Sequence, residues 1–190
     1  MPILGIIASQ ISGRLYDGPF GAYDSLAAVT VPSGGLASIT FSGIPTGYKH
    51  LQIRGFSRST DAGTNDVSGI LRFNSDSGAN YSWHRMYGYG SGGMGADSST
   101  NTSSIVFSSI LANGNTANCF SVVMSDILDY ANTSKFKTTR SLAGGDANNL
   151  GMVFMNSGNW RSLNAVSSIT LTASSGNFVQ NSQFALYGVK

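Results

Sequence analysis

The sequence predicts an all-β protein, a jelly-roll-like antiparallel β-sandwich with an extended N-terminal arm. Three observations favour this fold class. The chain of 190 residues has no glutamate and only four lysines, the usual residues of exposed helix faces, and is rich in Ser, Thr, Asn and Gly. Short segments alternate between apolar and polar residues, and clusters of turn-forming residues separate them regularly. For one domain of this size, a two-sheet jelly roll is the best match, and an immunoglobulin-like sandwich is the alternative.

Alternation at period two identifies about ten strands. In residues 50–54, Leu51 and Ile53 are expected to face inward, and residues 135–138 repeat this arrangement with Phe136 inward and Lys137 outward. The other predicted strands are residues 37–42, 69–74, 81–87, 104–110, 119–128, 150–155, 168–172 and 183–189.

Two glycine-rich segments are predicted to lie outside the strands. Residues 87–104 are polar apart from Met94 and are expected to form the longest loop, either a plain exposed insertion or a tip that contacts a partner. Residues 142–146 (LAGGD) resemble a phosphate loop, but no Gly-Lys-Ser/Thr follows, so a tight turn is expected.

Composition excludes several classes of function. The net charge is +2 and only 11% of residues are charged, which argues against a nucleic-acid partner. No apolar run approaches the roughly 18 residues of a membrane span, so no membrane partner is expected. The single cysteine, Cys119, allows no internal disulfide, and its apolar neighbours favour a buried, unreactive thiol.

The sequence offers little for catalysis, so the prediction is a protein that is not an enzyme and has no catalytic residues, cofactor or metal. His50 and His84 are expected to be surface or structural histidines, and no G-x-S-x-G elbow is present. Asp126 and Asp129 lie close in sequence, but alternation would place them on opposite faces of a strand. Aromatic side chains are the one pattern that suggests a ligand. A stacking platform for a host surface glycan is one interpretation of them, and ordinary strand packing is the other. The candidate glycan contacts are Trp83, Tyr87, Tyr89 and Trp160.

The N-terminal segment MPILGIIASQISG is apolar and carries no charged side chain. It has three interpretations: a signal peptide, which its missing positive charge disfavours, a first core strand, or an arm that docks on another protein. The docking interpretation divides the chain into two parts. Residues 1–24 are the arm and its Gly-rich connector, and residues 25–190 are the sandwich domain. Burying five Ile or Leu side chains contributes roughly 7–15 kcal/mol, offset by about 1–2 kcal/mol for each backbone residue ordered. The candidate docking residues are Ile3, Leu4, Ile6, Ile7 and Ile11.

Several stretches together resemble a family of small virion proteins of tailed bacteriophages, especially those of cyanobacteria. They are, in chain order, GIIASQISG, SGIPTGYKHLQIRGFSRS, LRFNSDSGANYSWH, ILDYANTSKFKTTRSL, SGNWRS and FALYGVK, and they cover nearly the whole chain. Members of this family are capsid cement or decoration proteins and tail-fibre or minor tail proteins. The resemblance implies a structural protein on the capsid exterior, or alternatively on a tail fibre. It also implies a homotrimer whose partner is the major capsid protein or another virion protein, and no catalytic residue belongs to the pattern.

Overall fold

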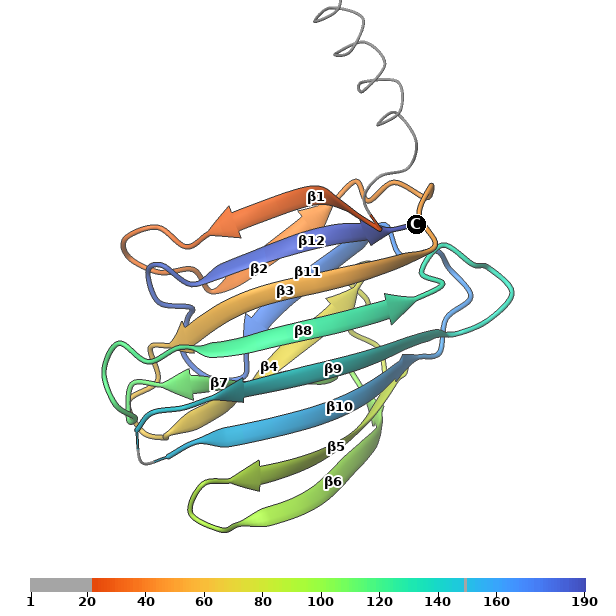
Figure 1. Ribbon diagram of the computed structural model, residues 1–190. Coiled ribbons are helices and arrows are strands. Elements are labelled where there is room, and N and C mark those ends of the chain that lie inside the picture. The colour runs from red at the N-terminus through yellow and green to blue at the C-terminus, as the bar shows by residue number, and fades with distance from the viewer. Residues whose placement is uncertain (1–21, 149) are drawn as a thin grey trace, which may run out of the picture.

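Twelve strands in two layers make up the protein, in a computed structural model that describes residues 22–148 and 150–190. The larger layer has eight strands and faces the viewer in Figure 1. In spatial order they are β1 (Tyr23–Thr30), β12 (Gln183–Val189), β3 (His50–Ser59), β8 (Ser121–Leu128), β9 (Lys137–Gly145), β10 (Met152–Trp160), β5 (Tyr81–Tyr89) and β6 (Met94–Thr102).

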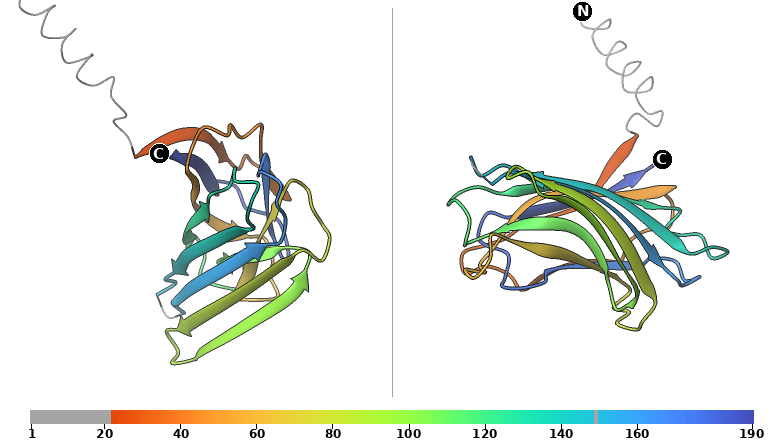
Figure 2. Two further views of the ribbon diagram at one scale, coloured as in Figure 1. Left: turned by 90° about the vertical axis from the view of Figure 1, so that its right-hand side faces the viewer. Right: turned by 90° about the horizontal axis from the view of Figure 1, so that it is seen from below.

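The smaller layer has four strands and lies behind the first. In order they are β2 (Ser38–Ser42), β11 (Ser168–Ala173), β4 (Asp66–Phe73) and β7 (Ile105–Ala112). A short parallel pairing of Arg58 and Ser59 in β3 with Leu111 and Ala112 in β7 joins the two layers at one end. Figure 2 shows both layers, with the larger sheet strongly twisted.

The strand order confirms the predicted jelly roll. The set β1-β12-β3-β8 faces the set β2-β11-β4-β7, and successive strands pass back and forth between the layers, which is the double Greek key of this fold. The alternative, an immunoglobulin-like sandwich, has a different strand order. Two additional hairpins, β5–β6 and β9–β10, lengthen the larger sheet on one side. This extension gives the larger sheet more surface than the smaller one covers.

Two strands were not predicted from the sequence. β6 replaces most of the expected loop at residues 87–104 and forms a hairpin with β5, in which Arg85 pairs with Asp97. β1 begins at Tyr23, two residues before the predicted start of the sandwich, and pairs with β12 across a register shift between Ser25 and Ala27.

Two local predictions were wrong. Lys137 is fully buried and Phe136 is exposed, the reverse of the expected alternation, because β9 begins at Lys137 and its inward positions continue through Thr139 and Ser141. The Lys137 ammonium donates hydrogen bonds to the carbonyls of Lys135 and Ser162. The expected turn at residues 142–146 is mostly strand, since β9 continues to Gly145.

Inward-facing side chains of both sheets form one hydrophobic core. At one end Phe73 and Tyr81 pack against Trp160, with ring centroids 5.4 and 6.2 Å from the indole. At the other, Phe178 packs edge-on against Phe184 at 5.3 Å. The core extends across both sheets and holds the larger sheet rigidly, so its outer face is a fixed surface.

Candidate functional site

The described residues bring together no cluster that suggests catalysis. Among residues 22–148 and 150–190, no three His, Cys, Asp or Glu side chains are placed to hold a metal ion. His50 Nδ1 accepts a hydrogen bond of 3.0 Å from the Asp129 backbone N–H, and His84 is exposed on β5. Cys119 is half-buried, less enclosed than the sequence predicted. Within residues 22–148 and 150–190, no helix has the length and apolar character needed to cross a membrane.

The four candidate glycan contacts do not form one platform. Trp160 is only 1% exposed and packs in the core, so its assignment as a surface contact is wrong. Trp160 is the last residue of β10 and pairs with Tyr81 of β5. Both side chains point inward, toward the core. Trp83, Tyr87 and Tyr89 are half-buried on the inner face of β5 and pack against the core. Their rings serve packing in part and are partly exposed to solvent.

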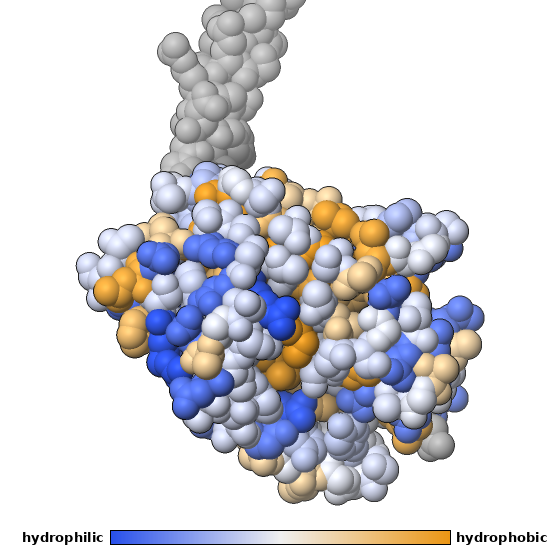
Figure 3. Space-filling view, turned by 180° about the vertical axis from the view of Figure 1, so that it is seen from behind, coloured by the Kyte–Doolittle hydropathy of each residue, from blue (hydrophilic) through white to orange (hydrophobic). Residues whose placement is uncertain are grey.

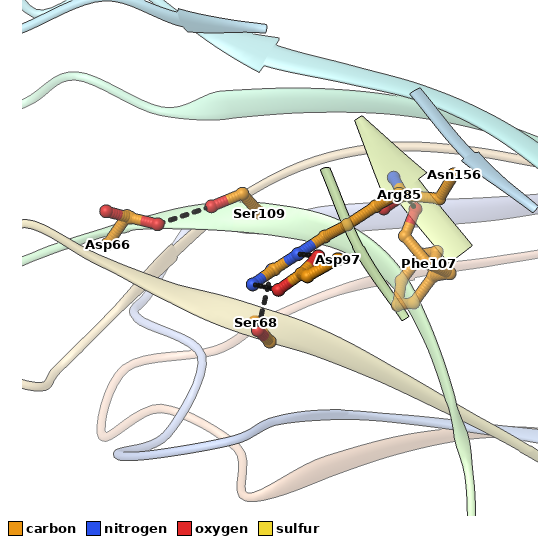
Figure 4. Close-up of polar contacts among 7 residues, drawn as sticks. All are labelled: Asp66, Ser68, Arg85, Asp97, Phe107, Ser109 and Asn156. Carbon is orange, nitrogen blue, oxygen red and sulfur yellow. Dashed lines mark hydrogen bonds and ion pairs between the residues drawn. The ribbon is translucent and has the colours of Figure 1, made fainter. Parts of the chain in front are cut away.

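Arg85 lies at the centre of those three aromatic residues. Its guanidinium donates to both carboxylate oxygens of Asp97, over 2.6 and 2.8 Å, and lies 5.5 Å from the Trp83 ring centroid and 5.6 Å from that of Tyr87. The hydrogen bonds from Arg85 to Asp97 raise the pKa of the arginine. A further nitrogen reaches Ser68 Oγ in β4 at 3.4 Å (Figure 4). The contact with Ser68 joins the β5–β6 hairpin to the smaller sheet. Because the charges of Arg85 and Asp97 neutralise each other, this pair offers no free charge to an anion.

Polar contacts next to this pair complete the junction between the layers. Ser109 donates to an Asp66 carboxylate oxygen over 2.7 Å, and the Asn156 side-chain amide donates to the Phe107 carbonyl over 3.3 Å (Figure 4). Asn156 Oδ1 is buried and has no hydrogen-bond partner within residues 22–148 and 150–190. These contacts connect β4, β7 and β10, so they attach the extension of the larger sheet to the smaller sheet.

The outer face of the larger sheet carries a patch of exposed apolar side chains that was not predicted. Each member is between 39% and 60% exposed, and the strand register places them next to one another. Leu142 in β9 lies between Met124 in β8 and Met155 in β10, and Met86 in β5 follows Met155. We call this set the apolar face. Its members are Phe56, Met86, Val122, Met124, Leu142, Val153 and Met155.

A groove of about 660 Å³ crosses this face over β1, β12, β3, β8, β9 and β10. Small residues make it hollow: Ala28 and Ala185 are paired neighbours in β1 and β12, and Gly144 lies between Val122 and Val153. A volume of this size accommodates several side chains or a small ligand. The groove is therefore large enough to receive several side chains of a peptide segment.

A chain of polar side chains borders the apolar face. Arg54 Nε donates to Gln52 Oε1 over 2.6 Å, and Gln52 Nε2 donates to an Asp126 oxygen over 2.7 Å. Arg140 donates to the other Asp126 oxygen over 3.0 Å. The Arg54 guanidinium also lies 4.8 Å from the ring centroid of Tyr23. Asp126 is paired with Arg140, whereas Arg54 is held by the neutral Gln52 and the Tyr23 ring, so this border carries a net positive charge beside the groove.

The outer face of the smaller sheet differs sharply in character. In Figure 3, which shows that side of the molecule, pale and blue residues predominate, with separate orange areas among them. Ser38, Thr40 and Ser42 on β2 point outward beside Ser168 and Thr170 on β11, and the Thr40 and Thr170 hydroxyls are hydrogen-bonded at 3.1 Å. The exposed apolar surface is thus concentrated on one of the two sheets.

The predicted docking residues Ile3, Leu4, Ile6, Ile7 and Ile11 lie outside the described residues. Ala22 is the first described residue, and its carbonyl accepts a hydrogen bond from the Lys190 backbone N–H at 3.2 Å. The chain therefore enters the sandwich beside the C-terminal end of β12, at the side of the apolar face formed by β1.

Comparisons with known proteins identify no family. No family model matches the sequence, and no curated protein matches it. Two solved structures show distant similarity. One is the infectious bursal disease virus VP2 subviral particle, with 14% identity, a TM-score of 0.11, and coverage of 89% of this chain and 40% of that one. The other is a protein of Bacteroides vulgatus named as a candidate pore-forming toxin, with 9% identity, a TM-score of 0.09, and coverage of 80% and 51%. The chain thus spans about two fifths to half the length of these proteins.

Proposed function

We propose that this protein is a structural component of a phage virion, a capsid cement or decoration protein that stabilises the head. The observation that carries the proposal is the apolar face with its groove, on a rigid sandwich. Contiguous exposed apolar surface, unlike single exposed apolar residues, is typical of a site that binds another macromolecule. The sequence resemblance to small phage virion proteins supplies the class of partner.

In this proposal the N-terminal arm, residues 1 to about 20, docks on the major capsid protein. The segment MPILGIIASQISG carries five Ile or Leu side chains and no charged one, so an apolar groove on a capsid subunit would accept it. One arm alone binds weakly after the cost of ordering it. Assembly as a trimer raises the effective concentration of the second and third arms, which adds roughly 10²–10⁴ in avidity.

Co-sedimentation with heads tests the cement role. Full-length protein is added to heads assembled from the major capsid protein, and a variant lacking residues 2–12 is the comparison. We expect the full-length protein to sediment with the heads and to raise the temperature at which they disrupt, and the deletion variant to do neither. Circular dichroism of the deletion variant checks that it is folded. Equal binding of both proteins would rule out the arm as the docking element.

The alternative is a host-recognition module of a tail or head fibre that binds a surface glycan. It is favoured by Trp83, Tyr87 and Tyr89, whose half-buried rings surround the Arg85–Asp97 pair. Partly exposed aromatic rings beside polar groups are suited to sugar rings. Binding of purified protein to host envelope glycans, compared with Trp83→Ala, distinguishes this function. Undetectable binding at millimolar sugar would exclude it.

A further inference from the structure

We infer that the groove on the apolar face is the binding site for residues 3–11 of the same chain. The occupant is the apolar N-terminal segment, and the groove holds it when no other virion protein is bound. This inference concerns the isolated protein, so it does not depend on the cement role. If that role is correct, the segment would move from this groove to the capsid.

Complementary chemistry supports the pairing. Fifteen of the described residues line the groove, and among these fifteen only Arg54 carries a charge at neutral pH. That guanidinium is already held by Gln52 and by the rings of Tyr23 and Tyr187. Residues 1–13 carry no charged side chain. The segment would therefore bring no charged side chain into the groove, and Arg54 would keep its hydrogen bond and its two ring contacts.

The position at which the chain enters the sandwich also supports it. Ala22 directly precedes β1, and two residues of β1, Ser25 and Ala28, line the groove itself. The ring of Tyr23 lies against Arg54, another lining residue. The connector that leads to residues 3–11 is therefore attached to the sandwich at one side of the groove.

The length of the connector is sufficient. From Ala22 back to Ile11 is a distance of eleven residues along the sequence, which when extended spans at most about 36–40 Å. The groove extends from β1 to β10, which are six consecutive strands of the sheet, or roughly 24 Å at 4.7–4.9 Å per spacing. Gly13, Gly18 and Gly21 lie within this connector and allow it to turn back.

Tethering favours the segment of the same chain over that of a neighbour. A short flexible connector gives the tethered segment an effective concentration in the millimolar range, well above the micromolar concentration of a purified protein. For equal contacts, the intramolecular complex therefore predominates.

Fluorescence of the apolar probe ANS tests whether the groove is covered. In the full-length chain we expect low emission, and in the full-length variant Ile6→Asp/Ile7→Asp an increase of several-fold, because two charges would remove the segment from the groove. Adding Leu142→Asp should abolish that increase. Adding Leu163→Asp should not, and it is a matched control because both leucines are 50% exposed but Leu163 lies outside the groove. Val153→Asp repeats the groove test with a second lining residue.

Disulfide trapping identifies the occupant. In a Cys119→Ser background, Ile7→Cys is combined with Val153→Cys, or with Leu163→Cys as the control. We expect an intrachain disulfide, seen as a monomer on a non-reducing gel, for the first pair only. A disulfide-linked dimer would show that a neighbour's segment fills the groove. Bright ANS emission from the full-length chain would show that the groove is open, and low emission from an oligomer of the double-aspartate variant would show that a second copy covers it. Each of these three results overturns the inference.

Discussion

The indole N–H of Trp160 donates a hydrogen bond of 2.7 Å to a carboxylate oxygen of Asp76. Trp160 is a core residue at the end of β10, whereas Asp76 lies in the turn after β4, so this contact joins the larger sheet to a loop of the smaller one. The same carboxylate accepts hydrogen bonds from the Gly78 backbone N–H and the Asn80 side chain. A residue that the sequence offered as a glycan contact is thus a junction between the two layers.

This contact predicts that stability depends on Asp76 in acid. The hydrogen bond from Trp160 lowers the pKa of Asp76 below its usual 3.8, against the opposing effect of burial. The stabilisation is therefore complete above about pH 5 and is lost as the pH falls through the lowered value. We expect Asp76→Asn to reduce the free energy of unfolding by about 1–3 kcal/mol at pH 7, and by much less at pH 2.

Urea unfolding at the two pH values measures this difference. Asp146→Asn is the control, because Asp146 is exposed and, among the described residues, accepts from the Asn148 backbone N–H in its own turn. A loss of the same size at both pH values would mean that the carboxylate charge has no part in the contact.

The sequence predicted the jelly roll because its apolar and polar residues alternate clearly where a strand has one face in the core. β4 is such a strand, with Val67, Leu71 and Phe73 all inward. The edge strand β6 could not be predicted, because MGADSSTNT pairs on one side only and buries little. A search for alternating apolar and polar residues cannot detect a strand of this kind, because the strand has almost no apolar residues.

The apolar face was missed for a related reason. In β8, Val123 and Ile127 face the core while Val122 and Met124 face outward, so both faces of the strand are apolar. A strand of this composition reads as fully buried, and only its place in the sheet shows that one side is uncovered. The groove could not be predicted either, since Ala28, Gly144 and Ala185 come together only through the strand register.

The hydrogen bonds of Arg58 predict that the stability of the fold requires a guanidinium group at this position. It is buried at the end of β3 and donates to the carbonyls of Asn115, Thr116 and Cys119 and to the side chain of Asn113. Lysine keeps the charge but cannot make this fork of bonds. We expect Arg58→Lys to lower the free energy of unfolding by about 2–4 kcal/mol.

Chemical denaturation of Arg58→Lys beside Arg72→Lys measures this requirement. Arg72 is a matched control, since its Nε makes a single hydrogen bond, to the Ser103 carbonyl at 3.0 Å. Hydrogen exchange should also show faster opening of residues 113–119 in Arg58→Lys alone. Equal losses in the two variants would contradict the special role of the fork.

Lys137 predicts a stability change at high pH. Burial lowers the pKa of its ammonium from 10.5, with a smaller contribution from the charge of Lys135. Between the lowered value and 10.5 the unfolded chain binds more protons than the folded one, so stability from this group rises with pH. Relative to Lys137→Met, the unchanged protein should therefore gain stability between pH 7 and pH 10. Urea unfolding of the unchanged protein and of Lys137→Met at pH 7 and pH 10 tests this prediction, because the effects of other titrating groups cancel when the two proteins are compared. The same difference in unfolding free energy at both pH values would contradict it.

Gly55 predicts a steric requirement directly beneath the groove. A Cβ at this position would lie 2.4 Å from Phe184 Cδ1 and 2.7 Å from the Gln183 carbonyl oxygen, whereas a Cβ at Gly47 would meet nothing within 4 Å. Because Phe184 is buried against Phe178, neither ring can move aside freely. We expect Gly55→Ala to lower the free energy of unfolding by about 1–3 kcal/mol and Gly47→Ala to change it by less than about 0.5 kcal/mol. Urea denaturation of the two variants in parallel measures the difference, and similar values would show that β3 and β12 separate at little cost.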